Sequence, residues 1–324
     1  MKSSVEYNNE GILSEMNGQP GVDMDMFYTA IETDPQNDGA HNNLGFLLMQ
    51  QGSLTEAMQH FDAALAMNPD NDIAHLNKGN VHLVKEELEF AYTHYVKALE
   101  LNRENVLAWE MLAKFFILVN QPEEVAKAWT QTVQLDPGEI RYSLELAIAL
   151  SALEKYDDAM ALLEQVVQQE HNNARAFRQM GIIHLVRKEY SMAEKLLKDA
   201  KGLAPGDEVV RYHLSLVYLA TGAYAEAEKE LRSLVQLNPE NMKARNDLAV
   251  LLVSRGEMEN ALTELNKSLQ ADPGNSKAKY YKAIALHQMN CFSEAEAILV
   301  ELNETADADY LIEAKFYLKK YFNY

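Results

Sequence analysis

Cysteine, positive charge and long apolar runs are all scarce in this chain of 324 residues. A single cysteine, Cys291, excludes an intramolecular disulfide framework. We expect it to be a buried small apolar residue, with a free thiol as the alternative. No segment has the roughly 18 continuous apolar residues of a membrane-spanning helix, and the first residues lack the apolar stretch of a secretion signal. These absences lead us to expect a cytoplasmic protein.

The charge balance excludes two classes of partner. Lys and Arg number 29 against 49 Asp and Glu, which gives a formal net charge of -20. DNA and anionic membranes bind proteins through a field of the opposite sign. We therefore expect no nucleic acid and no membrane among the partners, and we attribute the acidity to solubility.

Proline is scarce too, and its few positions organise the whole chain. All eight prolines fall at two places of a 34-residue register that starts at Ser4. Proline inside a helix loses a hydrogen bond and clashes with the preceding turn, so these two places mark turns between helices. The thirty-second place holds Pro35, Pro69, Pro137, Pro205, Pro239 and Pro273, and the seventeenth holds Pro20 and Pro122.

The register runs to Asp309 without an insertion or a deletion. It predicts an all-α fold with nine helix-turn-helix repeats over residues 1–309, followed by a closing helix over residues 310–324. Such an array is expected to form one elongated unit rather than two domains. The repeats begin at Ser4, Asp38, Asp72, Val106, Ile140, Ala174, Glu208, Met242 and Ser276.

Small residues recur at the eighth and twentieth places of the repeat, with large apolar residues between them. Gly45 and Ala57 are one such pair, close to Leu44, Leu48 and Phe61. A larger residue at a small place would overpack the contact between the two helices of a repeat, at a cost of roughly 1 to 3 kcal/mol. Gly or Asn at the fifteenth place predicts a left-handed residue at a helix end. That place holds Gly18, Gly52, Gly222, Gly256, Asn120 and Asn290.

The segment AHNNLGFLLMQQGSLTEAMQHFDAALAMNPDN, residues 40–71, resembles a tetratricopeptide repeat. The resemblance covers residues 4–309. It implies a right-handed superhelix, an α-solenoid, whose concave groove is lined by the first helix of each repeat and binds peptides. The family's Leu-Gly, Ala, Phe, Ala and Pro stand at Leu44, Gly45, Ala57, Phe61, Ala64 and Pro69, whereas Asp23 departs from its alanine and Arg103, His171 and Asp307 from its proline.

The two ends of the array differ from its middle. The first repeat carries polar Asn8, Asn9 and Glu10 where inner repeats have larger apolar residues, so we expect it to be the least stable. The segment 310–324 has Tyr317 at the small eighth place and arranges its apolar residues on one helical stripe. We expect this segment to close the stack, because an open array needs a cap. Docking of its aromatic residues on another protein is the alternative.

Six places of the first helices are expected to line the groove: the second, fifth, sixth, ninth, twelfth and thirteenth of the repeat. In repeats two to nine these places carry a net charge of +3, in a chain of net -20. With apolar neighbours such as Ile117 and Ile148, they suit a partner segment with apolar anchors and some acidic residues. The alternative is that the apolar members pack between adjacent helices. The candidate residues are Lys114, Arg141, Arg175, Arg178, Lys243 and Lys277, against the carboxylates Glu110, Glu145 and Asp247, together with Tyr212, Asn246 and Tyr280.

Asparagines form a second candidate site in the first third of the chain. Side-chain amides both donate and accept, so a row of them can hold a peptide backbone. The pattern resembles the asparagine ladder of peptide-binding tetratricopeptide proteins, and it stops at Met111. The sixth place holds Asn9, Asn43 and Asn77 in three successive repeats, with Asn42 and Asn80 nearby.

More specific sites are missing. The fifth and ninth places hold no Lys–Asn pair, so the carboxylate clamp of chaperone-binding tetratricopeptide domains is not present. No histidine pair at a spacing of four and no Cys–His cluster indicates a metal. No G-x-S-x-G elbow, P-loop or Rossmann motif indicates catalysis or a nucleotide. We therefore expect no metal, no cofactor and no enzyme activity in this chain.

These observations predict a protein-interaction scaffold that holds a partner peptide or subunit in its groove. An alternative from a different class is a self-assembling structural protein that stacks through its array ends. A third interpretation is the targeting subunit of an enzyme on another chain. Light scattering over a concentration series separates the first two, because a stable monomer disfavours assembly.

Overall fold

The computed structural model describes residues 2–17, 22–304 and 310–322, and these residues form nineteen α-helices and no strand. The all-α class expected from the sequence is therefore confirmed, as is its arrangement in helix pairs. The chain divides into two units, residues 1–162 and residues 163–324. In the described residues, no helix combines the length and the apolar composition that a membrane crossing needs.

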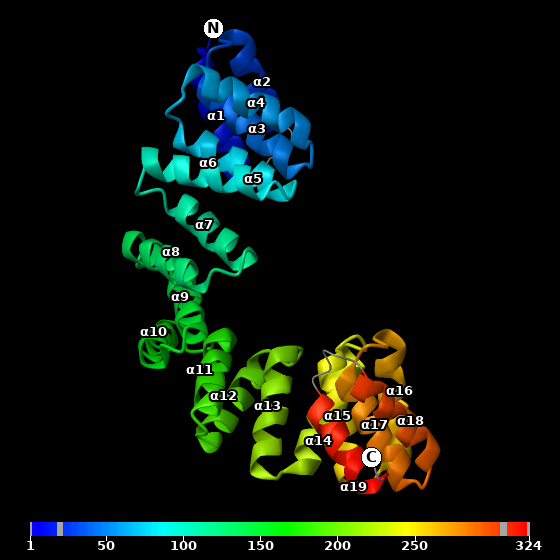
Figure 1. Cartoon of the computed structure of the whole chain (residues 1–324). Helices are drawn as coiled ribbons and strands as arrows, with labels where there is room; N and C mark the ends of the chain where they lie inside the picture. The colour runs from blue at the N-terminus through cyan, green and yellow to red at the C-terminus, as the bar shows by residue number, and fades with distance from the viewer. Residues whose placement is uncertain (1, 18–21, 305–309, 323–324) are drawn as a thin grey trace. The chain divides into compact units, whose positions relative to one another are not determined.

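The helices of the first unit occupy the blue to green part of Figure 1. They are α1 (Ser4–Met16), α2 (Val22–Thr33), α3 (Asp38–Gln50), α4 (Leu54–Met67), α5 (Asp72–Val84), α6 (Leu88–Leu101), α7 (Val106–Leu118), α8 (Pro122–Leu135) and α9 (Ile140–Ala152), and α10 (Tyr156–Gln169) contains the boundary between the units.

The helices of the second unit continue the same alternation. They are α11 (Ala174–Val186), α12 (Tyr190–Leu203), α13 (Glu208–Thr221), α14 (Tyr224–Leu237), α15 (Met242–Ser254), α16 (Met258–Ala271), α17 (Ser276–Gln288), α18 (Phe292–Glu304) and α19 (Leu311–Tyr321).

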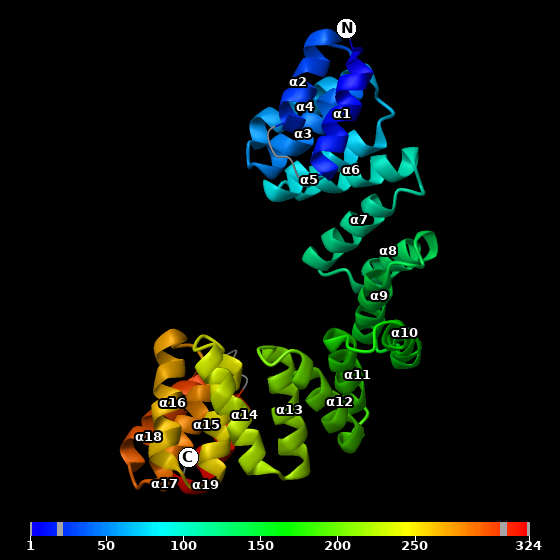
Figure 2. The same cartoon turned by 180° about the vertical axis from the view of Figure 1, so that it is seen from behind.

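Within each unit, the odd-numbered helices up to α17 begin at the residues where the 34-residue register starts its repeats. Each packs on the helix that follows it, from α1 with α2 to α7 with α8 in the first unit, and from α11 with α12 to α17 with α18 in the second. Figure 1 and its reverse view, Figure 2, show these pairs from opposite sides. Each odd helix is therefore the first helix of a repeat, and each even helix is the second.

A side chain at the last place of a repeat starts the next first helix and ties the two repeats together. Asn71 Oδ1 accepts a hydrogen bond from the Ala74 N–H at 2.9 Å, while Asn71 Nδ2 donates to Asp38 Oδ2 at 3.2 Å. The first contact satisfies an N–H that has no partner within the helix. The same two contacts are made by Asn37 toward Ser4, by Asn105 toward Asp72 and by Asn241 toward Glu208.

The fifteenth place is left-handed in every described repeat from the second to the ninth. The prediction is confirmed for Gly52, Gly222, Gly256, Asn120 and Asn290, whose φ angles run from 55° to 82°, while Gly18 lies outside the described residues. The sequence did not indicate three further members, Glu86, Glu154 and Lys188, which adopt φ angles of 61°, 60° and 60°. The turn therefore imposes this conformation even where the residue disfavours it.

The close contact at the small eighth place is confirmed as well. A Cβ added to Gly45 would lie 2.7 Å from Cε1 of Phe61, and one added to Gly79 would lie 2.7 Å from Cε1 of Tyr95. Both rings are fully buried between the two helices of their repeat. One detail of the turn prediction is wrong: Pro122 is the first residue of α8, a helical position where proline needs no N–H. Pro20 lies outside the described residues.

The last helix covers one end of the core of the second unit. Ala314 and Leu318 of α19 are 0% and 1% exposed and join a cluster with Leu299 of α18. The other face of α19 is open, since Ile312 and Phe316 are 79% and 66% exposed. The lone cysteine borders this cluster and is half-buried, so the expectation of a fully buried thiol is wrong.

Candidate functional site

The asparagines of the first unit bind one another across successive first helices. Asn43 Nδ2 donates to Asn8 Oδ1 at 3.0 Å, and Asn77 Nδ2 donates to Asn42 Oδ1 at 3.0 Å. Both bonds join the fifth place of one repeat to the sixth place of the next. The two pairs are linked, because Asn42 Nδ2 donates to Asn43 Oδ1 at 3.4 Å. These amides therefore hold neighbouring repeats in register.

Burial limits what this ladder can offer to a partner. Asn42 and Asn77 are 6% and 5% exposed, while Asn43 is half-buried. Asn80 stands apart from the ladder, where its Oδ1 accepts a hydrogen bond from the Tyr95 hydroxyl at 3.0 Å. The structure thus gives all four asparagines a contact within the protein, and their role toward a peptide stays a prediction.

Lys114 and Arg141 come together on one buried carboxylate. Lys114 Nζ lies 2.8 Å from Glu110 Oε1, and the Arg141 guanidinium donates to both carboxylate oxygens at 2.8 and 3.1 Å. The Tyr142 hydroxyl adds a third donor at 3.0 Å. Burial of Glu110 opposes its charge, but the hydrogen bonds from Lys114 and Arg141 hold the pKa of this carboxyl below its ordinary value. Two cations therefore share one buried carboxylate.

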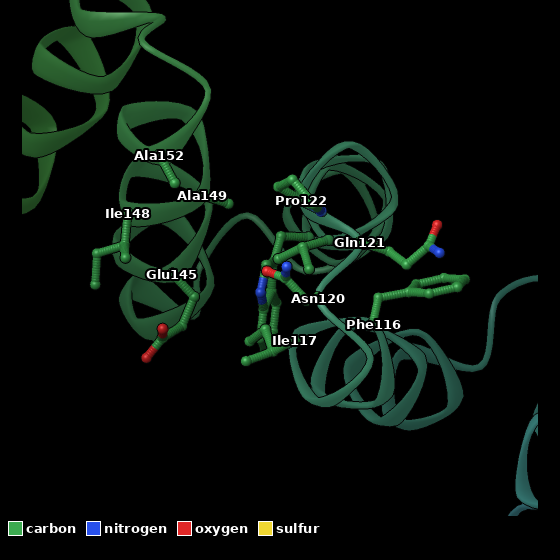
Figure 3. Close-up of a pocket in the computed structure, with 11 residues that line it drawn as sticks. Phe116, Ile117, Asn120, Gln121, Pro122, Glu145, Ile148, Ala149 and Ala152 are labelled. Carbon is green, nitrogen blue, oxygen red and sulfur yellow. The ribbon is translucent and has the colours of Figure 1, made fainter. Parts of the chain in front are cut away.

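An apolar pocket of about 240 Å³ lies between α7, the start of α8 and α9. Figure 3 shows Glu145, Ile148, Ala149 and Ala152 of α9 across from Ile117 of α7. Glu145, Ile148 and Ile117 stand at places that the sequence assigned to the groove, so the pocket opens on the face formed by the first helices. The other lining residues are Phe116, Asn120, Gln121, Pro122, Val125 and Trp129.

Two features of the repeats account for the pocket. The first helices α7 and α9 pack less closely than do α1, α3, α5 and α7 with one another. Val125 also takes the twentieth place, which is Ala91 in the repeat before and Ala159 in the repeat after. The branched side chain of Val125 lines the pocket and adds to its apolar surface. This departure from alanine was the one signal of the pocket in the sequence, and the pattern of small residues passed over it.

In the second unit, Asp247 binds two of the candidate residues, and a third packs on one of them. Its Oδ1 accepts from Lys277 Nζ at 2.5 Å and its Oδ2 accepts from the Tyr212 hydroxyl at 2.8 Å. Lys243 Nζ lies 4.6 Å from the centre of the Tyr212 ring, within the range of a cation–π contact. Burial and then the bond to Asp247 raise the pKa of Tyr212, which keeps its hydroxyl a donor. The bond between Tyr212 and Asp247 again joins a fifth place to a sixth place.

The two arginines of α11 do not join the Asp247 cluster. Arg178 Nη1 pairs with Asp207 Oδ2 at 2.6 Å, and Asp207 is the residue that caps the start of α13. Arg175 is exposed on the same helix. Sequence reasoning missed Asp207 because a capping residue stands outside the six groove places. Its carboxylate reduces the positive charge that was counted for this face.

Asn246 and Tyr280 occupy the fifth place of the last two repeats. Asn246 is 6% exposed, and in the described part of the chain its Oδ1 has no hydrogen-bond partner. Tyr280 stacks on Tyr310, with ring centres 5.2 Å apart and an angle of 26° between the planes. Tyr280 therefore contacts Tyr310, the residue at the start of α19.

Histidines pair in a way that the sequence did not indicate. His41 and His75 share the fourth place of their repeats, and His60 and His94 share the twenty-third, but the structure brings His41 to His60 and His75 to His94, with Nδ1 atoms 3.0 Å apart in both cases. Each pair joins the two helices of one repeat. Over residues 2–17, 22–304 and 310–322, no three His, Cys, Asp or Glu side chains gather as a metal site would require.

Comparison with known proteins agrees with this architecture. Family profiles described as Tetratricopeptide repeat match residues 144–208, 212–276 and 252–312, and a profile described as TPR repeat matches residues 47–86. The comparison with curated proteins finds no match.

Two solved structures are similar in fold. YrrB, described as a TPR protein with an unusual peptide-binding site, is 24% identical over 57% of this chain and 95% of its own, with a TM-score of 0.52. The APC/C hetero-tetramer Cut9-Hcn1 contains a chain that is 16% identical over 82% of this chain and 52% of its own, with a TM-score of 0.60. This chain therefore spans about half the length of the second relative. Because the profiles match most of the array and the helix pairs follow its register, this chain belongs to the tetratricopeptide repeat family.

Proposed function

We propose that this chain is a non-enzymatic scaffold that holds a partner segment on the face formed by its first helices. The observation that carries the proposal is the pocket between α7 and α9, where the groove residues Ile117, Glu145 and Ile148 line an apolar space of about 240 Å³. Ile117 is 55% exposed, so the protein alone leaves this apolar surface in water. A partner side chain that fills the pocket removes that surface from water, which favours binding.

The charged residues of this face contribute to partner choice more than to affinity. Lys114 and Arg141 already pair with Glu110, Arg178 with Asp207, and Lys277 with Asp247. Paired charges on an interface steer a partner and reject a wrong one, while apolar anchors supply most of the free energy. Peptide binding by YrrB, a protein of the same family, is in keeping with this role.

Purification from the native cell, followed by peptide identification, tests the proposal when it is combined with a variant that fills the pocket. Ala152 lines the pocket and is exposed, so Ala152→Trp occupies the space without entering the core. We expect a partner that copurifies with the wild-type chain and is lost with Ala152→Trp, at an unchanged helix content by circular dichroism. A partner retained by Ala152→Trp, or none above background, would count against the proposal.

Self-assembly is the second candidate function, and the open face of α19 is the observation that favours it. Two large apolar residues, Ile312 and Phe316, are mostly exposed there. Light scattering over a concentration series tests this alternative. A mass that stays at one chain at all concentrations would disfavour it, and a mass that rises in the wild type but not in Ile312→Glu would support it.

A further inference from the structure

We infer that the pocket between α7 and α9 takes one large apolar side chain from a basic partner segment, with Lys or Arg beside the anchor near the start of α8 and the end of α9. The inference rests on the proposed function and adds the charge of the partner. For this pocket, it replaces the earlier expectation of a partner segment with acidic residues, which was based on the net charge of the whole groove.

The first unit carries most of the net negative charge of the chain. It has 9 Lys and Arg against 26 Asp and Glu, a net charge of -17, whereas the second unit has 20 against 23, a net charge of -3. In the first unit the groove places hold Lys114 and Arg141 against Glu110 and Glu145, which cancel, so the groove surplus of +3 comes from the second unit. An acidic field of this size attracts basic segments and repels acidic ones.

Carboxylates also stand directly beside the pocket, where its helices end or begin. Glu123 follows the lining residue Pro122, and Glu154 lies two residues beyond the lining residue Ala152. Both carboxylates are exposed. Over residues 106–162, four Lys and Arg stand against nine Asp and Glu. A cation next to the anchor would therefore meet negative charge at the end of α9 and the start of α8.

The size and lining of the pocket define the anchor. A volume of about 240 Å³ is below the roughly 300 to 1,000 Å³ of sites for drug-sized ligands, so it suits a single side chain. Phe116 and Trp129 line it together with Ile117 and Ile148. Aromatic and sulfur-containing side chains pack well against such rings, which favours Trp, Phe or Met as the anchor.

Fluorescence anisotropy with synthetic peptides tests the inference on the full chain. Three short labelled peptides are compared: one with a central Trp between Lys residues, one with the same Trp between Glu residues, and one with Ala between Lys residues. We expect the Trp–Lys peptide to bind about tenfold more tightly than either of the others. We also expect this preference to shrink as salt rises, because salt screens the charges.

A charge reversal with a matched control locates the effect. In Glu123→Lys/Glu154→Lys, both carboxylates beside the pocket become cations, and Lys is tolerated at the left-handed residue because Lys188 stands at the same place of its repeat with a φ of 60°. The control, Glu86→Lys/Glu89→Lys, makes the same change at the same two places of the repeat, away from the pocket. We expect the first variant to weaken the Trp–Lys peptide about tenfold and the control to change it far less.

The outcomes separate this inference from the proposed function. Equal binding of the Trp–Lys and Trp–Glu peptides, both lost in Ala152→Trp, would overturn the basic partner and leave the scaffold proposal standing. An equal loss in the control and in the pocket variant would overturn the basic segment at this pocket. Binding that persists in Ala152→Trp, or no binding of any Trp peptide, would overturn both.

Discussion

The two units fill the same contact of the repeat with different chemistry. The fourth place of a first helix meets the twenty-third place of its second helix. In the first unit this contact is made twice by two histidines, and in the second unit it is made twice by an arginine and a glutamate. The pairs are His41–His60 and His75–His94, with 3.0 Å between nitrogens, and Arg211–Glu230, at 3.0 Å, and Arg245–Glu264.

Both kinds of pair also hold the turn that precedes the repeat. His75 Nε2 lies 3.2 Å from the Pro69 carbonyl oxygen, and Arg211 Nη2 donates to the Pro205 carbonyl oxygen at 2.8 Å. His75 therefore carries its proton on Nε2, and its Nδ1 accepts from His94 Nδ1–H, an assignment made from the hydrogen-bond network. The contact thus requires a donor toward the turn and a bond between the helices. A neutral pair and an ion pair both satisfy it, but they respond differently to substitution and to pH.

Removing the buried arginine should produce the largest effect. Arg245 is 5% exposed and binds Glu264 and the Pro239 carbonyl. In Arg245→Ala the largely buried Glu264 loses its arginine and keeps only the exposed Lys267, whose Nζ lies 3.0 Å from Oε1, so we expect a loss of roughly 3 kcal/mol in the free energy of unfolding. In His75→Ala, a neutral hydrogen bond is lost, and we expect roughly 1 to 2 kcal/mol. Urea unfolding, with hydrogen exchange in the affected repeat, measures both, and an equal loss in the two variants would contradict the comparison.

Acid should separate the histidine pairs from the arginine–glutamate pairs next. Burial and then the nearby Lys78, His75 and His82 lower the pKa of His94 to about 4, with Asp62 acting in the opposite direction. An unfolded histidine has a pKa of about 6.5, so below that value the unfolded state binds more protons than the folded state. The stabilisation is fully present above about pH 6.5 and is lost as the pH falls toward about 4. We expect α5 and α6 to lose protection from hydrogen exchange as the pH falls from about 6.5 toward about 4.

Repeat eight is the internal control for the acid prediction. Residues 242–275, which form α15 and α16, contain no histidine. Their protection should not change over the same range of pH. His94→Gln keeps a donor and an acceptor toward His75 and removes the titration, so it should flatten the response of α5 and α6. A response that persists in His94→Gln would assign the acid sensitivity to another group.

Substitutions at the left-handed turns should change stability by a smaller amount, with a gain at one turn and a loss at another. Glu154 has a φ of 60° and Gly222 a φ of 77° at the same place of their repeats. Because glycine adopts this conformation without the strain of a Cβ, we expect Glu154→Gly to gain, and Gly222→Ala to lose, about 1 kcal/mol of stability. Thermal unfolding compares the two with Glu123→Gly, a helical control that should lose stability. A loss in Glu154→Gly would show that the side chain of Glu154 matters more than its backbone.

Salt should have the smallest effect on stability, and it tests the charge difference between the units. The first unit has a net charge of -17 and the second of -3. Screening relieves repulsion within the more highly charged unit, so added salt should stabilise the first unit more, by roughly a few tenths of a kcal/mol. Hydrogen exchange at low and at physiological salt resolves the two units, and a larger gain in the second would reverse the comparison.

The fold could be predicted from the sequence because the same types of residue recur at the same places of successive repeats. The prolines marked most turns, and the small residues at the eighth place marked contacts such as Gly45 against Phe61, which the structure confirms. Glu86, Glu154 and Lys188 could not be predicted as left-handed, because the turn overrides their local preference. The histidine pairs were missed for a related reason. Their members are 19 residues apart and lie on two different helices, whereas the 34-residue register aligns residues that are one whole repeat apart.

The candidate site could be predicted only in outline. The structure brings three residues of the groove places, Ile117, Glu145 and Ile148, to one pocket, while their role toward a partner stays a prediction. The pocket itself depends on Val125 and on the spacing of α7 and α9. No single residue determines the spacing between two helices, so this feature could not be predicted from the sequence. The ion pair of Arg178 with Asp207 and the bond of Tyr142 to Glu110 were also missed, since Asp207 and Tyr142 stand outside the six groove places.

The central claim is that a partner segment lies on the face of α7 and α9 with its anchor in their pocket. Photo-crosslinking tests this most directly, with a photoreactive amino acid in place of Ile148 at the pocket or of Gln134, an exposed residue on the second helix α8. With the Trp–Lys peptide as probe, we predict crosslinks from the Ile148 position and few from the Gln134 position. Equal yields at the two positions, or a higher yield at Gln134, would contradict the account.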